Sequence, residues 1–289
     1  MEKLQIKANA KINLALAVKF KREDGYHELE LIYQEIDFSD NLILAKSRDI
    51  IFTSNDTSLG PVRDNLCVRA ARLLQKEFAV GGLNIHLEKQ IPTGGGLGGG
   101  SSDGAAILKG GLKLYGRTVP DNKLRSLAAT LGSDVPFFLN GGTAYARGRG
   151  EQITPVHIFS DYKILLIFPP LSISTVWAYK NLNLALTSKY ADYKFRGFRF
   201  QNLGLADFKK EFFNDFETSV FAAYPVLAEI KSRLYESGAV FAAMSGSGAV
   251  MYGLYDDEKL LKSAHAALQK IFDCRISSPV TGKDRETRQ

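Results

Sequence analysis

Large hydrophobic residues alternate with smaller or polar ones near the start of the chain. Within residues 4–18, every second position from Ile12 to Val18 carries a large aliphatic side chain, which is the period of a half-buried strand. Because successive side chains of a strand point to opposite faces, Lys11 and Asn13 share the face opposite those aliphatic residues. The pattern therefore predicts a strand that presents two polar side chains together.

Beyond this strand the pattern predicts short strands and helices to the end of the chain. The Asp24-Gly25 pair indicates a turn. Asp64 can cap a helix whose apolar stripe runs from Leu66 to Phe78. The further elements expected, in chain order, are strands at 26–38 and 83–87, a helical pattern at 105–112, a helix at 121–131 ended by residues 132–136, short strands and turns at 141–150, a strand at 163–168, a helix at 225–236, strands at 239–244 and 250–255, a helix at 258–272 and a strand at 275–280.

The second half of the chain has the order strand, helix, two strands, helix, strand, once the insert between residues 170 and 224 is left aside. This order is typical of a ferredoxin-like βαββαβ fold. We therefore expect an α+β protein of two domains, with a boundary between residues 155 and 162. The expected division is residues 1–157, residues 158–280 and a polar, mobile tail at residues 281–289.

The composition is that of an ordinary globular protein, with 45% hydrophobic and 24% charged residues among 289. Two cysteines and four scattered histidines give neither a disulfide framework nor metal-ligand spacing, so we expect no zinc site. Apolar stretches such as residues 164–170 are too short to cross a bilayer, and the chain enters a strand pattern at once, without a signal-like segment. A cytoplasmic protein without a membrane partner is therefore expected.

The net charge of +6 is compatible with a nucleic acid or with an anionic small substrate. The basic residues are dispersed, however, with no run of five or more and no stripe of arginine and aromatic residues. Charge alone therefore favours phosphate groups only weakly, and a solvated basic surface explains it equally well.

A glycine-rich segment lies between a predicted strand and a predicted helix. It reads Pro92-Thr-Gly-Gly-Gly-Leu-Gly-Gly-Gly-Ser-Ser-Asp103. Glycines let a backbone approach a ligand closely, and the amide groups at a helix start bind phosphate oxygens. We expect the loop to end, and the helix to begin, at Ser101 and Ser102. Asp103 is expected to be structural, because a carboxylate there would repel phosphate.

Three other interpretations of this segment fit less well. A Walker loop requires a lysine after its last glycine, and no lysine follows here. Gly94-x-Gly96-x-x-Gly99 satisfies the dinucleotide pattern, but Asp121, the acid about twenty residues later, precedes a helix where the pattern needs the end of a strand. A flexible linker rarely carries a proline, a leucine and paired serines in register with a strand and a helix. A phosphate loop of another kind is therefore favoured.

The order of three motifs resembles the GHMP family of small-molecule kinases. The motifs are Ala10-Lys-Ile-Asn-Leu14, Pro92–Ser102 and Met244-Ser-Gly-Ser-Gly-Ala249, and they span nearly the whole sequence. The resemblance implies a ribosomal-S5-like N-terminal domain, a ferredoxin-like C-terminal domain, and phosphoryl transfer from ATP with Mg²⁺. It also implies that Pro92–Ser102 binds the ATP phosphates and that the third motif packs beside that loop. No magnesium ligand is identified.

Further details resemble those members that phosphorylate the 2-hydroxyl of a cytidine diphosphate-linked methylerythritol on the non-mevalonate route to isoprenoids. These details are Asp24-Gly-Tyr-His27, Gly132-Ser-Asp-Val-Pro-Phe-Phe138 and Asn214-Asp-Phe-Glu217. The resemblance implies that Asp134 orients or deprotonates the accepting hydroxyl. Lys11 is its implied partner, since a nearby ammonium would keep Asp134 ionised and offset charge on the moving phosphoryl group.

The resemblance assigns the remaining candidate residues to two ligands. His27 and Asn13 are expected to hydrogen-bond the edge of a cytosine ring, while Tyr26 and Tyr179 stack on its faces, with Trp177 as the fallback for Tyr179. Gly246, Ser247 and Gly248 are further substrate-binding candidates. The expected ATP-binding residues are Pro92, Gly94, Gly95, Gly96, Leu97, Gly98, Gly99, Gly100, Ser101 and Ser102 in the loop, with Asn65, Leu66 and Lys89 at the adenine pocket.

Four alternatives remain open on the sequence alone. A sibling such as a homoserine or mevalonate kinase would use another acceptor, and Tyr26-His27 is the feature that favours cytosine. A Rossmann oxidoreductase would bind NAD, a nucleic-acid-binding protein would bind oligonucleotides with a steep salt dependence, and an inactive family member is disfavoured by the presence of both Lys11 and Asp134. As partners we expect a small molecule and no nucleic acid, with the chain a monomer or a weak homodimer.

Overall fold

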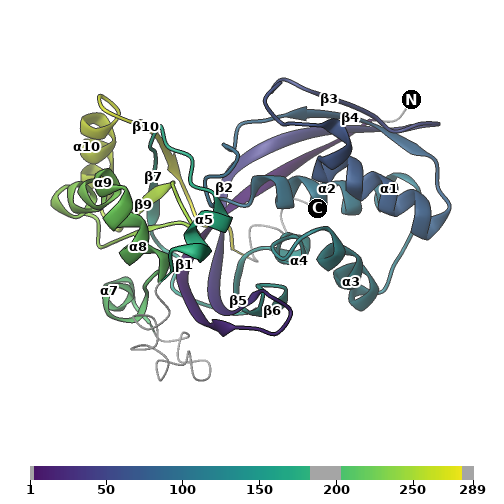
Figure 1. The fold of residues 1–289 in the computed structure, drawn as a ribbon. Helices are drawn as coiled ribbons and strands as arrows, with labels where there is room; N and C mark the ends of the chain where they lie inside the picture. Colours follow the sequence, from purple (N-terminus) through teal and green to yellow (C-terminus); the bar gives the residue numbers. More distant parts are fainter. Residues whose placement is uncertain (1–2, 183–202, 282–289) are drawn as a thin grey trace. The chain divides into compact units, whose positions relative to one another are not determined.

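The computed structural model describes residues 3–182 and 203–281 (Figure 1). Its contacts divide the chain into two compact units, each discontinuous in sequence: unit 1 comprises Met1–Ala10, Phe38–Thr93 and Gly98–Gly141, and unit 2 comprises Lys11–Asp37, Gly94–Leu97 and Gly142–Gln289. The boundary predicted at residue 157 is a division along the chain and stays a prediction. The tail predicted to be mobile lies outside the described residues from residue 282 onward.

Two long strands take part in both units. β1 spans Lys3–Lys21 and β2 spans His27–Ser47, and the predicted turn lies between them, with Gly25 at φ +84°. Both predicted strands are confirmed, although β2 continues well past Phe38. The predicted half-buried character of β1 is wrong, because both of its faces are buried from Ala10 to Val18. Local alternation could not reveal this, since it describes one face against the other and not what covers each.

Unit 1 is a sheet packed against helices. β4 (Gly82–Glu88) pairs antiparallel with the end of β2 and parallel with β3 (Ile51–Ser54). A Cβ on Gly110 would lie 2.3 Å from the Ile6 side chain, and one on Gly111 would lie 2.4 Å from the Leu74 side chain. The helix that carries these glycines is therefore held tightly between the sheet and its neighbour. The helices of unit 1 are α1 (Leu66–Phe78), α2 (Gly99–Leu114), α3 (Asp121–Leu131) and α4 (Val135–Asn140), with a 3-10 turn, η1 (Val62–Asp64).

Three local predictions in unit 1 are corrected. α1 is capped by Asn65, whose Oδ1 accepts a hydrogen bond from Cys67 N at 2.9 Å, while Asp64 ends the preceding 3-10 turn. α2 begins at Gly99, before the paired serines. The segment expected only to end α3 also starts α4, because Pro136 stands in the first turn, where a missing N–H costs no helical hydrogen bond.

Unit 2 contains the predicted ferredoxin-like fold. Its four-stranded antiparallel sheet has the order β10-β7-β9-β8, and α9 and α10 contact its strands. The sheet and these helices comprise β7 (Lys163–Phe168), α9 (Pro225–Glu236), β8 (Phe241–Met244), β9 (Met251–Tyr255), α10 (Glu258–Leu268) and β10 (Asp273–Ser277). α10 ends four residues before the predicted Phe272, because the chain turns there to enter β10.

The rest of unit 2 consists of two strands beside the start of β2 and the helices of the long insert. β2 pairs with β5 (Thr143–Gly148), which pairs in turn with β6 (Gln152–Pro155), a strand that the sequence did not predict. The described parts of the insert form α5 (Thr175–Lys180), the 3-10 turn η4 (Leu205–Asp207), α7 (Phe208–Glu211) and α8 (Phe216–Ala223). Within the described residues, every helix is too short or too polar to span a membrane.

Candidate active site

The C-terminal end of the glycine loop forms the start of α2 in unit 1. Gly98 is the N-cap residue with φ +70°, and no side chain caps the helix there. The helix was predicted to begin at Ser101 and Ser102, but it begins at Gly99, and both serines lie in its first turn. The first-turn amide groups have no helical acceptor and carry the positive end of the helix dipole. This helix start can therefore bind an anionic oxygen through backbone donors alone.

The apex of the loop, Gly94–Leu97, belongs to unit 2 and packs on the third motif. Gly96 has φ +79°, and a Cβ there would lie 1.9 Å from Ser245 O, so only glycine fits both the conformation and the space. Gly96 O accepts a hydrogen bond from Ser245 Oγ at 2.9 Å, and Val250 N donates to Gly95 O at 3.3 Å. The predicted packing of the third motif beside the phosphate loop is thus present within unit 2.

Lys11 is enclosed beside this apex. Its ammonium donates to Asn13 Oδ1 at 2.6 Å and to Gly96 O at 2.9 Å, and it lies 5.2 Å from the centre of the Tyr33 ring. The expectation that Lys11 and Asn13 share a face is met, and both residues are at least 95% buried. A lysine fixed this way holds one buried positive charge at the loop apex, where it can stabilise added negative charge.

The residues expected to contact a base all belong to unit 2, and two of them are in contact. The ring of His27 stacks on Tyr179 with centroids 4.7 Å apart and an interplanar angle of 19°. Tyr26 is 54% exposed, with the Arg149 guanidinium 4.6 Å from its ring centre. Burial and, to a smaller extent, the charge of Lys21 lower the pKa of His27, so its imidazole is neutral at pH 7. A neutral imidazole has one donor and one acceptor nitrogen, which is what recognition of a base edge requires.

The glycine motif adds backbone and hydroxyl groups near Asn13. A Cβ on Gly246 would lie 3.4 Å from Asn13 Oδ1, and Ser247 Oγ lies 3.1 Å from Thr175 Oγ1. Gly248 lies at the other end of the same turn, with φ +92°. Ser245, which was not among the predicted site residues, joins this turn to the loop through its hydrogen bond to Gly96 O. Its Oγ also accepts from Asn13 N of β1 at 3.4 Å. Its place inside a quoted motif was the available signal.

Asp134 lies in unit 1 at the N-cap position of α4. Its side chain is half-buried and makes no capping hydrogen bond to α4. Its carboxylate therefore does not serve as the cap of α4. Lys11 belongs to unit 2, and the pairing of the two residues stays a prediction.

The three residues expected at an adenine pocket have structural contacts of their own in unit 1. Asn65 caps α1, and Leu66 is the first residue of that helix. The Lys89 ammonium forms ion pairs with Asp40 at 2.5 Å and Asp103 at 3.0 Å. The predicted adenine contacts of all three residues stay predictions. No local pattern indicates the Asp40 partner, because Asp40 lies on β2, far from Lys89 in sequence.

The cluster of Lys89, Asp40 and Asp103 lies under the start of α2. A Cβ on Gly99 would lie 2.8 Å from Lys89 Nζ. Burial lowers the pKa of Lys89, but the charges of Asp103 and Asp40 outweigh it and the net pKa is raised. Burial raises the pKa of Asp103 to about 7, with Lys89 opposing and Asp40 reinforcing that shift. Asp103 is therefore a buried structural acid, as the sequence predicted.

No cluster of three potential metal-binding side chains occurs among the described residues. Mg²⁺ bound with a nucleotide needs no such cluster, because it keeps most of its waters and takes phosphate oxygens with one or two protein groups. The start of α2 offers backbone amides that fit phosphate oxygens. Separately, within unit 2, the loop apex carries one buried ammonium, that of Lys11.

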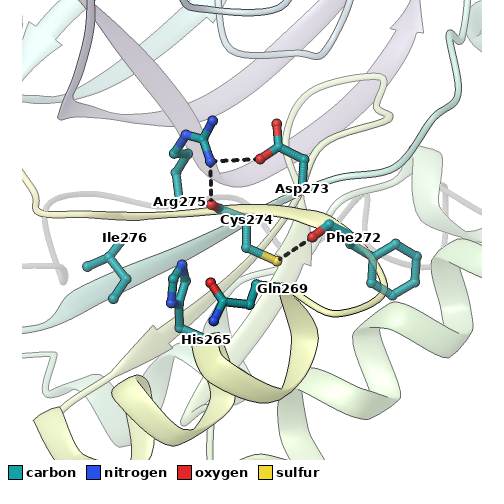
Figure 2. Close-up of a pocket in the computed structure, with 7 residues that line it drawn as sticks. All are labelled: His265, Gln269, Phe272, Asp273, Cys274, Arg275 and Ile276. Carbon is teal, nitrogen blue, oxygen red and sulfur yellow. Dashed lines mark hydrogen bonds and ion pairs between the residues drawn. The ribbon is translucent and has the colours of Figure 1, made fainter.

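A separate cavity of about 450 Å³ opens in unit 2 beside α10 and β10 (Figure 2). Cys274 Sγ donates to Phe272 O at 3.4 Å, and burial raises the pKa of this thiol to about 11. The thiol stays protonated, so the cavity lacks an activated nucleophile. Its lining residues are His265, Gln269, Phe272, Asp273, Cys274, Arg275 and Ile276, and none of the predicted site residues is among them.

Comparison with known proteins agrees with the fold and with the motifs. Residues 65–142 match the family model for the GHMP kinases N terminal domain, and residues 199–274 match the one for the GHMP kinases C terminal domain. The chain belongs to the GHMP kinase family, and it is a small-molecule kinase with the two-domain α+β fold of that family.

Individual relatives are more specific. The chain is 37% identical over 281 residues to the 4-diphosphocytidyl-2-C-methyl-D-erythritol kinase of Pelodictyon phaeoclathratiforme, covering 96% of this chain and 98% of the relative. It is 40% identical over 258 residues to the enzyme of the same name from Chlorobaculum tepidum, covering 89% and 90%.

Two solved structures are similar to this chain over nearly its full length. A crystal structure of 4-(cytidine 5'-diphospho)-2C-methyl-D-erythritol kinase superimposes with a TM-score of 0.78 at 32% identity, covering 96% of this chain and 99% of that one. A homoserine kinase from Cytophaga hutchinsonii superimposes with a TM-score of 0.75 at 17% identity, covering 98% and 96%. At that lower identity the likeness concerns the fold alone.

Proposed function

We propose that this chain transfers the γ-phosphoryl group of ATP to the 2-hydroxyl of 4-diphosphocytidyl-2-C-methyl-D-erythritol, on the non-mevalonate route to isoprenoids. The observation that carries the proposal is the 37–40% identity, over nearly the full length, to curated relatives with that name. The neutral His27 beside Tyr26 and Tyr179 supports a base-linked substrate over homoserine or mevalonate, since those alcohols offer no aromatic ring to recognise.

In this proposal the phosphate loop binds ATP mainly through its backbone. Phosphoryl transfer needs alignment and charge neutralisation more than covalent chemistry. The uncapped amides at the start of α2 donate to phosphate oxygens. Lys11, held by Asn13 Oδ1 and Gly96 O, offsets negative charge at the loop apex. The family chemistry implies Mg²⁺, which would neutralise negative charge on the transferring phosphoryl group when bound.

In the same proposal, Asp134 acts on the accepting hydroxyl of the substrate. Its carboxylate aligns the 2-hydroxyl for in-line attack on the γ-phosphorus and takes up the hydroxyl proton as the new O–P bond forms and the bond to ADP breaks. Asn13 and His27 hydrogen-bond the cytosine edge, and Tyr26 and Tyr179 stack on the ring. Gly246, Ser247 and Gly248 are proposed to border the same substrate, and Asn65, Leu66 and Lys89 to border the adenine.

The test is an ADP-release assay with MgATP and the cytidine-linked substrate, run beside homoserine and mevalonate at equal concentrations. Release with the cytidine-linked alcohol alone is expected. Release with homoserine or mevalonate in its place would keep the kinase class and reject the proposed substrate. Size measurement of the purified chain and a cell-fractionation assay check the accompanying expectations of a monomer or weak dimer in the cytoplasm.

A further inference from the structure

The segment Asn214-Asp-Phe-Glu217 has no role in the proposed chemistry, yet its first residue is buried in the middle of unit 2. Asn214 is 5% exposed. Its Nδ2 donates to both Met244 O and Gly246 O at 2.8 Å, and its Oδ1 accepts from Phe216 N at 3.0 Å. One amide thus holds two carbonyl groups of the glycine turn at a fixed spacing, with both of its protons used.

The turn that Asn214 holds carries the contact to the phosphate loop. Ser245 lies between the two carbonyl groups, and its Oγ donates to Gly96 O at 2.9 Å. The same oxygen of Gly96 accepts from the Lys11 ammonium at 2.9 Å. A shift of the turn would therefore change the position of the oxygen that fixes Lys11.

The neighbours of Asn214 continue the arrangement in two directions. The rings of Phe216 and Tyr179 are perpendicular, with centroids 4.9 Å apart, and Tyr179 stacks on His27. Asp215 N donates to Leu16 O at 3.0 Å, and Val18 N donates to the Asp215 carboxylate at 2.7 Å. The segment is thus anchored to β1 and borders the residues proposed to bind the base.

We propose that Asn214 is a positioning residue for the phosphoryl-transfer step. It acts on Gly96 and Lys11 through the turn that contains Ser245. Its neighbour Phe216 contacts Tyr179, so the same segment also borders the residues proposed to bind the base. The inference rests on the proposed function for its kinetic readout. The replacement Asn214→Asp keeps the shape but sets carboxylate oxygens against two carbonyl oxygens, which removes both donors and adds repulsion.

A double-mutant cycle distinguishes this role from general stabilisation. Asn214→Asp is expected to lower kcat by roughly 30-fold or more, and Ser245→Ala by roughly 10-fold, since each removes placement of Lys11 and not substrate contact area. If Asn214 acts through Ser245, the double variant is expected to be no slower than the slower single variant, because coupled residues are not additive. Asn214→Ser, which keeps one donor, replaces the aspartate variant if that variant does not fold.

Gln34 provides a matched control for the same chemical change. Its buried Nε2 donates to Glu35 O and Val280 O, and its Oε1 accepts from Thr143 Oγ1. Gln34→Glu should therefore destabilise the protein comparably in thermal unfolding while the folded enzyme keeps kcat within about 3-fold of the unmodified value. An equal loss of kcat in this control would overturn the positioning role.

Two further outcomes would also reject the inference: kcat of Asn214→Asp within about 3-fold of the unmodified enzyme, or single losses that multiply in the double variant. Failure of the proposed function is a separate result, seen as no ADP release by the unmodified chain. In that case the same set of variants is compared by how far MgATP raises the unfolding temperature of each. This readout does not depend on the acceptor, because the Lys11 and Gly96 contacts act on the phosphate loop. Multiplicative effects in that readout would reject the inference in the same way.

Discussion

At the scale of single residues, the carboxylate of Asp134 is the most exacting test of the proposed chemistry. Asp134→Asn keeps the size of the side chain but removes the negative charge and the proton acceptor. We expect kcat to fall by about 100-fold or more while the KM for ATP changes by less than about 3-fold, because the loss falls on the reacting hydroxyl. ADP release and direct ATP binding measure the two quantities.

The control for this change is Asp121→Asn, at an exposed acid in the first turn of α3. That variant should retain full turnover. Activity of Asp134→Asn close to that of the control would remove Asp134 from the mechanism and leave alignment to the phosphate loop and Lys11.

His27 is the corresponding test of base recognition. His27→Ala removes the neutral imidazole and its stacking partner on Tyr179, so we expect KM for the cytidine-linked substrate to rise by about 10-fold and discrimination against a uridine-linked analogue to be lost. Competition assays with both substrates measure this, and His157→Ala, at an exposed position, is the control. Unchanged discrimination would mean that another group reads the base.

At the scale of elements, the phosphate loop requires a glycine at position 96, because of its positive φ and its close contact with Ser245. Gly96→Ala forces a Cβ to within 1.9 Å of Ser245 O in a positive-φ conformation, so we expect the free energy of unfolding to fall by about 3 kcal/mol. Gly60→Ala is the matched control, with φ +71° and no atom within 4 Å of the added Cβ. It should cost only about 1 kcal/mol, from strain alone. Equal losses in urea unfolding would contradict the close packing.

The free energy of unfolding should also depend on pH through Asp103, in the first turns of α2. Its pKa is about 7 in the folded protein against an ordinary value of 3.8, so the folded chain retains a proton that the unfolded chain releases. Stability is therefore highest below about pH 4 for this group, falls as pH rises through about 7 and is level above that, with a slope of at most ~1.4 kcal/mol per pH unit.

Asp103→Asn should flatten this part of the profile. The asparagine stays neutral at every pH, so the variant loses less stability than the unmodified chain between about pH 4 and pH 7. Urea unfolding at several pH values measures the slope, and Asp256→Asn, at an exposed acid, controls for the change in net charge. Identical slopes in Asp103→Asn and the unmodified chain would show that the buried proton lies elsewhere.

The elements themselves were largely predictable, because hydrophobic period and caps are local. α3, β7 and α9 have the predicted bounds, and the ferredoxin-like strand order followed from the succession of elements. Features that depend on distant partners were not predictable. Burial of both faces of β1, the pairing of Lys89 with Asp40, and the hydrogen bond from Ser245 to Gly96 each join positions far apart in sequence. The site residues themselves rested on motif resemblance and remain to be tested by substitution.

At the scale of the whole molecule, each unit is built from segments that are not consecutive in the sequence. β1 and β2 each contribute to both units, and the loop apex belongs to unit 2 while the residues on either side of it belong to unit 1. Near the end of the described chain, Val280 N donates to Glu35 O, and Ile36 forms a bridge with Pro279. Unit 2 is therefore completed by residues from opposite ends of the sequence.

This interleaving limits how the gene can be divided. A cut between residues 157 and 158 would give a C-terminal fragment without β1, β2, β5 and β6, and with the partner of Val280 on another polypeptide. Neither fragment should fold when it is produced alone, whereas co-expression should restore a complex that releases ADP. The two fragments would then behave as complementing parts of one folding unit, and fusion partners or new termini would be tolerated at exposed turns in preference to this cut.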